Sequence, residues 1–280
     1  MDMSDYRVVD EDDLKIIAIT KSEGSISKNF IDKIEKHSSK LIVVKTSKIV
    51  KSDSKILSEI FNLIGNWSYG YIIFLSSNAV NVFFETATTL NIVNEIVYDL
   101  NSKFNVVAIG PSTQTALKKH RIVVKEIPQD HSSLGIIEFF SHLKNNAYGS
   151  KIILLRSKKA DKYLKEKLIK LGFVVDEFYI YNVISADVDS VWIEFFDLLR
   201  KNKIDSLIFT SPSNVNHFIK ILQQHSSELF PLVCKIKIIL SIGPLTSKEL
   251  IKYSIPFSES KDHSLEGLYE KLYEKLYIKK

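Results

Sequence analysis

The 280-residue sequence contains one cysteine, and its longest hydrophobic runs are far shorter than the roughly 20 residues that cross a bilayer. A single cysteine cannot form a disulfide within the chain, and it also excludes a site built from several thiolates. The seven histidines form no close pair of the His-x-x-x-His kind, so we expect no metal. Cys234 lies in the apolar stretch LVCKIKIIL, which we interpret as a strand that buries the thiol as a small hydrophobe.

The common phosphate-binding and nucleophile motifs are also missing. Neither G-x-G-x-x-G nor G-x-x-x-x-G-K-[ST] occurs, which argues against a dinucleotide fingerprint and a P-loop, and no G-x-S-x-G supports a serine hydrolase. The acidic residues form no evident paired-carboxylate site. We therefore expect no organic cofactor, and a ligand would be held by backbone N–H groups, hydroxyls and scattered basic residues.

The formal net charge of +5 is spread through the chain, without a dense Lys/Arg block or an RNP-type aromatic signature. This modest excess is compatible with an anionic ligand and argues against nucleic acid. The acidic segment 1–14 has neither the layout of a signal peptide nor that of a transit peptide. We therefore expect a cytoplasmic protein that does not bind a membrane.

Short apolar, β-branched runs alternate with amphipathic segments of helical length along nearly the whole chain. This alternation is typical of βαβ units and predicts an α/β fold with mostly parallel sheets. The expected strands are 15–20, 41–45, 71–75, 105–109, 122–125, 151–155, 173–178, 205–209, 236–241 and 255–257. At the C-terminal end, Leu268, Leu272 and Leu276 share one helical face, which predicts a helix that docks on the rest of the protein.

Three segments of the first half recur in the same order in the second half. The pairs are KIIAITKS (15–22) and KIILLRSK (151–158), IIFLSSNAVNVFF (72–84) and LIFTSPSNVNHFI (207–219), and AIGPSTQTAL (108–117) and SIGPLTSKEL (241–250). Their spacing is nearly equal, because Ser77 follows Ile16 by 61 residues and Ser211 follows Ile152 by 59. The chain therefore resembles two similar α/β units.

Each repeated segment predicts a strand that ends where a helix begins. In the two IGP segments, a glycine permits the turn, a proline fixes φ, and hydroxyl side chains can cap the first turn of the helix. The carboxyl ends of parallel strands are where α/β proteins bind ligands, and helix N-termini favour anions. The alternative is that these Ser, Thr, Asn and Pro residues serve only as ordinary caps.

Together with LLRSKKADKYLKEKLIKLGFVVDEFYIYNV (154–183), these segments resemble the uroporphyrinogen-III synthase family, from Lys15 to about Leu268. The resemblance implies two Rossmann-like or flavodoxin-like domains that are joined by two crossing linkers, with the active-site cleft between them. It also implies a discontinuous first domain, residues 1–46 plus 184–280, and a second domain, residues 47–183.

Members of that family convert hydroxymethylbilane, a linear tetrapyrrole, into uroporphyrinogen III, with inversion of ring D and loss of water. The resemblance thus implies a hydro-lyase of haem biosynthesis that needs neither metal nor cofactor, and it is compatible with a monomer and with transient handover from the preceding pathway enzyme. The alternative is a two-lobed binding protein for a small anionic ligand or a tetrapyrrole, without enzymatic activity.

The resemblance assigns one catalytic candidate, Tyr181, which would assist departure of the hydroxyl as a proton donor or a hydrogen-bond partner. A phenol with a pKa near 10 is protonated at neutral pH, whereas the alternative is a packing role in the linker. In regular strand geometry Tyr179 would share the face of Tyr181, which makes it a second candidate, whereas a bulge would turn it to the opposite face. The residues expected to bind substrate are Lys21, Ser76, Ser77, Asn78, Thr113, Arg156, Ser211, Ser213, Asn214 and Thr246. The basic side chains among them would pair with carboxylates, or else be solvated surface charges.

Overall fold

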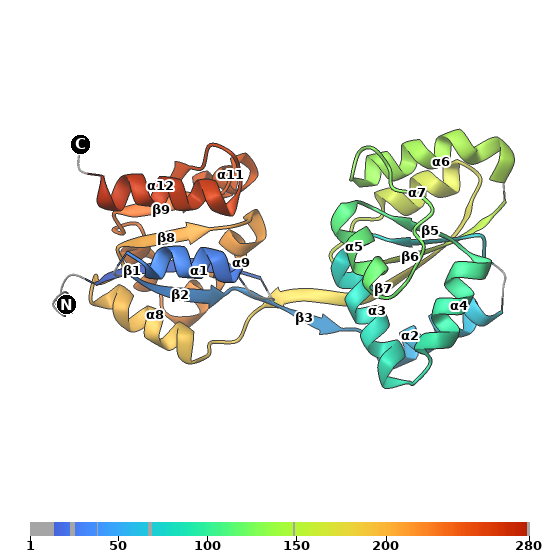
Figure 1. Cartoon of the computed structure of the whole chain (residues 1–280), viewed down its shortest axis with the longest axis horizontal. Coiled ribbons are helices and arrows are strands. Elements are labelled where there is room, and N and C mark those ends of the chain that lie inside the picture. Colours follow the sequence, from blue (N-terminus) through green and yellow to red (C-terminus); the bar gives the residue numbers. More distant parts are fainter. Residues whose placement is uncertain (1–13, 23–25, 38, 67–68, 148, 279–280) are drawn as a thin grey trace, which may run out of the picture. The chain divides into compact units, whose positions relative to one another are not determined.

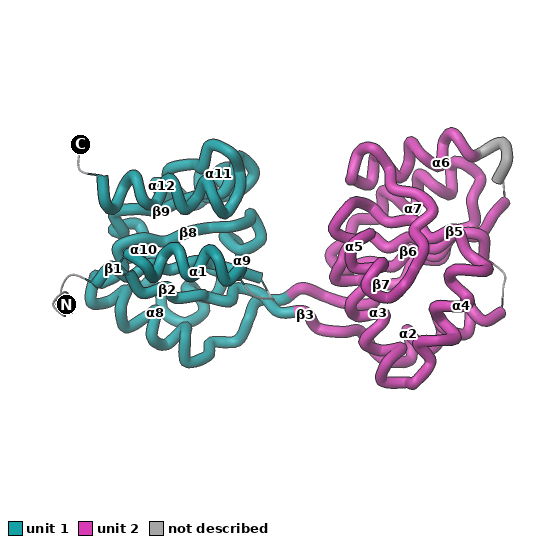
Figure 2. The backbone as a smooth tube through the Cα atoms, in the orientation of Figure 1, with its two compact units in different colours: residues 1–48, 184–280 teal, residues 49–183 magenta. Residues whose placement is uncertain are grey.

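The protein divides into two compact units, one made of residues 1–48 and 184–280 and the other of residues 49–183 (Figures 1 and 2). The computed structural model describes residues 14–22, 26–37, 39–66, 69–147 and 149–278. The chain passes from one unit to the other twice, after residue 48 and after residue 183. The division implied by the family resemblance has its crossings after residues 46 and 183.

Unit 1, which comprises residues 1–48 and 184–280, is built on a five-stranded sheet in the order β10-β9-β8-β1-β2. Strand β1 pairs in parallel with both β2 and β8, and β9 pairs in parallel with β8 and β10. The strands are β1 (Lys15–Lys21), β2 (Ser39–Lys45), β8 (Ser206–Phe209), β9 (Ile238–Ser241) and β10 (Ser258–Glu259). The strand order reverses between β1 and β8, which makes their carboxyl ends a topological switch point.

Helices cover both faces of this sheet. The helices are α1 (Lys28–Glu35), α8 (Ser190–Arg200), α9 (Pro212–His225), α10 (Leu229–Val233), α11 (Pro244–Lys252) and α12 (Leu265–Tyr277). Helices α8 and α9 form one hydrophobic core against the sheet, and α1 and α12 form the other. In α12, Leu268 and Leu272 are buried and Leu276 packs against them, which confirms the predicted docking helix.

Unit 2, residues 49–183, has a five-stranded sheet in the order β3-β7-β6-β4-β5. Strand β4 pairs in parallel with β5 and β6, and β6 with β7. The strands are β3 (Ser47–Lys51), β4 (Tyr71–Phe74), β5 (Asn105–Ala108), β6 (Lys151–Ser157) and β7 (Val174–Ser185). Here the switch point lies between β4 and β6. The parallel sheets confirm the predicted α/β class.

Two helical layers cover the sheet of unit 2 as well. The helices are α2 (Ser54–Gly65), α3 (Ser77–Thr89), α4 (Val93–Lys103), α5 (Pro111–Lys119), α6 (Ser133–Ala147) and α7 (Tyr163–Lys170). The larger core packs α2 to α5 against one face, and a smaller core packs α6 and α7 against the other. Because both faces are covered, the strands β4, β5 and β6 are mostly buried apolar runs, as is typical of parallel sheets.

Three details of the predicted secondary structure are wrong. Residues 122–125 form no strand, because this edge segment joins β5 only through isolated contacts such as the bridge of Glu126 to Val107. The last strand lies at Ser258–Glu259 and not at 255–257. Cys234 follows the last residue of α10 and precedes β9, so it does not begin a strand, although burial does raise the pKa of its thiol.

Candidate functional site

The candidate site of unit 2 lies at the carboxyl ends of β4 and β6, where the strand order reverses. Side chains that follow adjacent parallel strands meet at one edge of the sheet, and α/β proteins bind ligands at such a switch point. Ser76 follows β4, Arg156 and Ser157 end β6, and Tyr181 lies in the neighbouring strand β7. The sheet thus brings together sequence candidates that are up to 105 residues apart.

Ser76 and Tyr181 form a hydrogen-bonded pair at this edge. Ser76 is the N-cap of α3, and its hydroxyl accepts a hydrogen bond of 3.0 Å from the N–H of Ala79. The same hydroxyl lies 2.8 Å from the phenol oxygen of Tyr181. Since the cap fixes the serine, the serine in turn fixes the orientation of the phenol.

A β-bulge in β7 gives Tyr181 its orientation. Arg156 is opposite Tyr179, and the next residue of β6, Ser157, is opposite Tyr181, so Ile180 is an extra residue in β7. Ile180 and Tyr181 consequently both pack in the larger core of the unit. The expectation that Tyr179 shares the face of Tyr181 is wrong, because it assumed a regular strand.

The phenol of Tyr181 is held in its protonated form. Only 5% of the residue is exposed, and this burial raises the pKa of the phenol, while the hydrogen bond to Ser76 and the charge of Arg156 act in the opposite direction. A protonated phenol next to a hydroxyl can donate its proton to a third group. The geometry is therefore suited to general-acid chemistry.

The guanidinium of Arg156 forms an ion pair and a hydrogen bond within unit 2. Its Nη1 lies 2.9 Å from Oε1 of Glu177 and donates to the carbonyl oxygen of Asp161 at 3.0 Å. The phenol of Tyr179 donates to Oε2 of the same Glu177 at 2.7 Å. The Nε of Arg156 is buried and has no hydrogen-bond partner among the described residues. Arg156 is thus a buried charge balanced by Glu177, and it lies near enough to Tyr181 for its charge to lower the pKa of the phenol.

The remaining candidates of unit 2 lie at the N-termini of α3 and α5. Ser77 and Asn78 are half-buried in the first turn of α3. Thr113 is only 1% exposed in the first turn of α5, and its Oγ1 has no hydrogen-bond partner in the part of the chain that the structure describes. A buried hydroxyl without a partner is uncommon, which makes Thr113 a position that a ligand could satisfy.

In unit 1, Asn214 binds the strand ends at the switch point. Its Oδ1 accepts hydrogen bonds from Ser22 at 2.8 Å and from Thr46 at 2.9 Å. Its Nδ2 donates to the hydroxyl of Thr210 at 2.8 Å, and the residue is 2% exposed. Because the amide is satisfied from within the unit, it holds the start of α9 against the segments that follow β1, β2 and β8.

The other candidates of unit 1 lie at the end of β1 and at the starts of α9 and α11. Ser211 is the N-cap of α9, and its hydroxyl lies 3.1 Å from that of the exposed Ser213. Thr246 is buried in the first turn of α11. Lys21 ends β1, and partial burial lowers the pKa of its ammonium group.

Helix capping agrees with the paired segments 72–84 and 207–219 and corrects the residue from which the spacing was measured. The sequence spacing pairs Ser77 with Ser211, but the residues whose side chains cap α3 and α9 are Ser76 and Ser211. Asn214 is therefore equivalent to Ala79. The amide that binds the strand ends is consequently peculiar to unit 1.

Sequence reasoning missed a fourth repeated segment. DHSSLG (130–135) in unit 2 and DHSLEG (262–267) in unit 1 share a D-H-S-x-x-G pattern. In both copies the histidine packs against the glycine of the preceding IGP turn. The repeat is visible in the sequence by the same search that found the other three.

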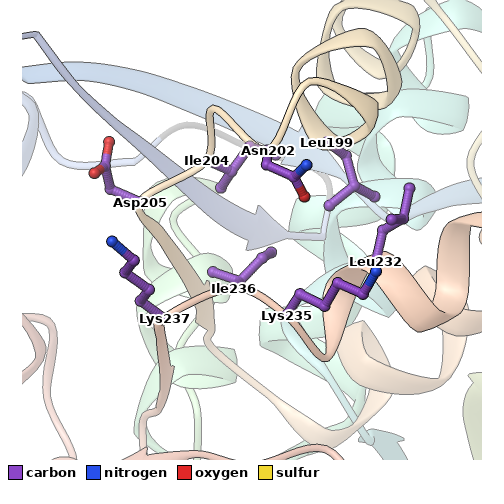
Figure 3. A pocket seen from close by; sticks show the side chains of 8 residues that line it. All are labelled: Leu199, Asn202, Ile204, Asp205, Leu232, Lys235, Ile236 and Lys237. Carbon is purple, nitrogen blue, oxygen red and sulfur yellow. The ribbon is translucent and has the colours of Figure 1, made fainter.

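The hollow drawn in Figure 3 lies away from these residues. It has a volume of about 140 Å³, and Asp205, Lys235 and Lys237 are among its lining residues. These residues precede β8 and β9, so the hollow is at the amino edge of the sheet of unit 1. Among the described residues no group of three or more His, Cys, Asp or Glu could hold a metal, and no helix is long and apolar enough to span a membrane.

Comparisons with known proteins identify the family of this chain. The family model described as "Uroporphyrinogen-III synthase HemD" matches residues 28–270. The chain belongs to the uroporphyrinogen-III synthase family. A relative from Methanothermobacter thermautotrophicus, described as "Putative uroporphyrinogen-III synthase", is 26% identical over 225 residues, which cover 80% of this chain and 85% of the relative.

Two solved structures show the same fold as this member of the uroporphyrinogen-III synthase family. The uroporphyrinogen-III synthetase of Helicobacter pylori matches with a TM-score of 0.56 and 17% identity over 91% of this chain and 97% of that one. A mutant uroporphyrinogen III synthase of Thermus thermophilus matches with a TM-score of 0.55 and 15% identity over 92% of this chain and 98% of that one. The alternative of a non-enzymatic two-lobed binding protein is not favoured.

Proposed function

We propose that this protein is a cyclising hydro-lyase that converts hydroxymethylbilane into uroporphyrinogen III. The observation that carries the proposal is the pairing of Tyr181 with the helix cap Ser76 at a switch point, in a chain that belongs to this family. A buried, protonated phenol at this position can supply the proton that a departing hydroxyl needs.

The reaction begins when the C–O bond to the ring-A hydroxymethyl group breaks. Tyr181 donates its proton to the departing oxygen, so that water leaves and an azafulvene remains. Ring D attacks through its substituted carbon, and rearrangement through a spiro intermediate inverts this ring. The proton that ring D loses at the end balances the proton donated by Tyr181.

Substrate binding is assigned to residues at the carboxyl edges of the two sheets. The substrate carries many carboxylates, and the N-termini of α3, α5, α9 and α11 present N–H groups and hydroxyls that suit them. We assign binding to Lys21, Ser76, Ser77, Asn78, Thr113, Arg156, Ser211, Ser213, Asn214 and Thr246, of which Arg156 and Asn214 act mainly by holding their neighbours. We further propose that the protein acts as a monomer and accepts its substrate by transient handover from the preceding pathway enzyme.

Supplying freshly made hydroxymethylbilane to the purified protein tests this function. The products are oxidised to porphyrins, and their isomers are separated. We expect the type III isomer in excess over the type I isomer that forms without enzyme. If only type I forms, at the rate of the uncatalysed reaction, the proposal is wrong.

A further inference from the structure

The two IGP turns have the same local structure but different surroundings. Gly110 precedes α5 and Gly243 precedes α11, and in neither helix does a side-chain hydrogen bond cap the first turn. A Cβ built on Gly110 would lie 3.1 Å from Cβ and Cγ of His131, and one on Gly243 would lie 3.2 Å from Cγ of His263. At each turn the glycine leaves room for an imidazole that packs directly on it.

The repeated D-H-S-x-x-G segment holds both imidazoles in the same way. The serine after each histidine accepts a hydrogen bond from the N–H of the glycine three residues later, and its own hydroxyl donates to the preceding aspartate. A side chain on Gly135 would clash with the backbone of Asp130, and one on Gly267 with Asp262. Both histidines are exposed, so each presents its ring to solvent at the N-terminus of a helix.

In unit 1, this position already contains a carboxylate of the protein. Glu259 accepts a hydrogen bond from Ser247 in α11, and its Oε1 lies 3.6 Å from Nε2 of His263. The Ser247 hydroxyl also lies 2.9 Å from that of Ser241, which in turn donates to the carbonyl of Gly243. The carboxylate of Glu259 thus lies next to this turn and its histidine.

In unit 2, the residues equivalent to Glu259 and Ser241 are apolar. Val107 of unit 2 forms a bridge with Glu126, and Leu240 of unit 1 pairs with Ser258. Glu126 is therefore equivalent to Ser258, and the next residue, Ile127, is equivalent to Glu259. By the same register, Ala108 replaces Ser241. At this position unit 2 therefore has an apolar side chain where unit 1 has the carboxylate of Glu259.

The first turn of α5 also contains the buried hydroxyl of Thr113, which has no partner among the described residues. The ring of His131 packs on Gly110, which precedes the same turn, and it is held there because Nδ1 donates to the carbonyl oxygen of Pro128 at 3.0 Å. With Nδ1 engaged, Nε2 is the nitrogen available to a ligand. An unfilled hydroxyl, an uncapped helix and an imidazole together form a receptor for an anion.

We propose that His131 is a substrate-binding residue, which in its imidazolium form binds a carboxylate of the substrate together with Thr113 at the first turn of α5. His263 has no such role, because Glu259 occupies its surroundings. The two anion-receiving turns predicted from the repeat are thus not equivalent. This inference rests on the proposed function, since it names where that substrate is bound.

The test compares His131→Gln with His263→Gln as a matched pair in the full-length protein. We expect His131→Gln to raise KM for hydroxymethylbilane about tenfold, with kcat nearly unchanged, because one charge-assisted hydrogen bond to bound substrate is lost. His263→Gln should leave both constants near those of the wild type. His131→Arg, which restores a cation, should recover most of the affinity, a result that a purely structural histidine would not give.

A second measurement separates failure of the inference from failure of the proposed function. Fluorescence titration with uroporphyrin III, a stable tetrapyrrole octacarboxylate, gives a dissociation constant without any turnover. We expect His131→Gln, and not His263→Gln, to weaken this binding by a similar factor. Equal effects of the two variants, or no effect of His131→Gln, would overturn the role of His131, whether or not the wild-type protein forms the type III isomer.

Discussion

The phenol oxygen of Tyr181 lies 2.8 Å from the hydroxyl of Ser76, which also accepts the N–H of Ala79 at the start of α3. The phenol in β7 is thereby tied to a helix cap that lies 105 residues away in the sequence. The β-bulge at Ile180 makes this contact, because without it the side chain would face the other side of the sheet. A positioned proton donor is the arrangement that departure of a hydroxyl requires.

Replacing Tyr181 by Phe removes the proton donor while keeping the ring in the core. We expect formation of the type III isomer to slow by about 100-fold or more, the range of a general acid. The free energy of unfolding should fall by no more than about 1.5 kcal/mol, because Ser76 keeps its bond to Ala79. Tyr179→Phe is the matched control, and its rate should stay close to that of the wild type. Equal losses in the two variants would remove Tyr181 from its assigned role.

Asn214→Ala should destabilise unit 1 although it removes no hydrophobic contact of note. The change leaves the hydroxyls of Ser22, Thr46 and Thr210 without the amide that joins them. We expect the free energy of unfolding to fall by about 2–3 kcal/mol, measured by urea denaturation. Ser213→Ala, one residue earlier and exposed, should change it by no more than about 0.5 kcal/mol.

Arg156 and Glu177 form a buried ion pair, with side chains 8% and 4% exposed. Arg156→Met leaves an unpaired buried carboxylate, so the free energy of unfolding should fall by about 3–5 kcal/mol. The double variant Arg156→Met/Glu177→Leu should be more stable than either single variant, because no uncompensated charge remains. Additive losses in a double-mutant cycle would show that the two side chains act independently.

Stability at alkaline pH should depend on the buried phenols of unit 2. Burial raises the pKa of Tyr69, Tyr71 and Tyr181, and the hydrogen bond to Glu177 raises that of Tyr179. The unfolded chain therefore releases phenolic protons first, and the stabilising contribution of each group is complete below about pH 10 and lost as pH rises toward the folded pKa. Urea denaturation between about pH 9.5 and 11.5 should show a falling free energy of unfolding.

The single-residue form of this test uses Tyr181→Phe. One titrating group changes the free energy of unfolding by at most about 1.4 kcal/mol per pH unit. The free energy of unfolding of the variant should therefore fall less steeply with pH than that of the wild type, by up to this amount per pH unit. Tyr98→Phe is the control, since 69% of Tyr98 is exposed. An identical slope for Tyr181→Phe and the wild type would contradict the raised pKa.

Much of this fold could be predicted from the sequence, because strand and turn signals are local. Apolar runs indicated the parallel strands, and the Gly-Pro turns indicated the starts of α5 and α11. Ser76 and Tyr181 were both candidates before their contact was known, and the structure brings them together. The edge segment at 122–125 was predicted as a strand because its β-branched residues resemble one, although only a single bridge follows it.

The rest could not be predicted because it depends on distant partners. Nothing in the sequence FYIYNV indicates that Ile180 is an extra residue, since a bulge is defined only against the neighbouring strand. Asn214 has a side chain that could bind a ligand, and only its hydrogen bond with Thr46, 168 residues away, shows that the amide is already satisfied. The discontinuous domain came from the family resemblance and not from the repeat, which favours two contiguous halves.

The central claim is tested most directly by the isomer ratio of the product as a function of protein concentration. Freshly made hydroxymethylbilane is mixed with increasing amounts of wild-type protein, and the oxidised porphyrins are separated by isomer. The account predicts that the type III fraction rises with protein concentration until it dominates, while Tyr181→Phe at the same concentrations leaves mostly type I. A type III fraction that does not depend on the concentration of the wild-type protein would contradict it.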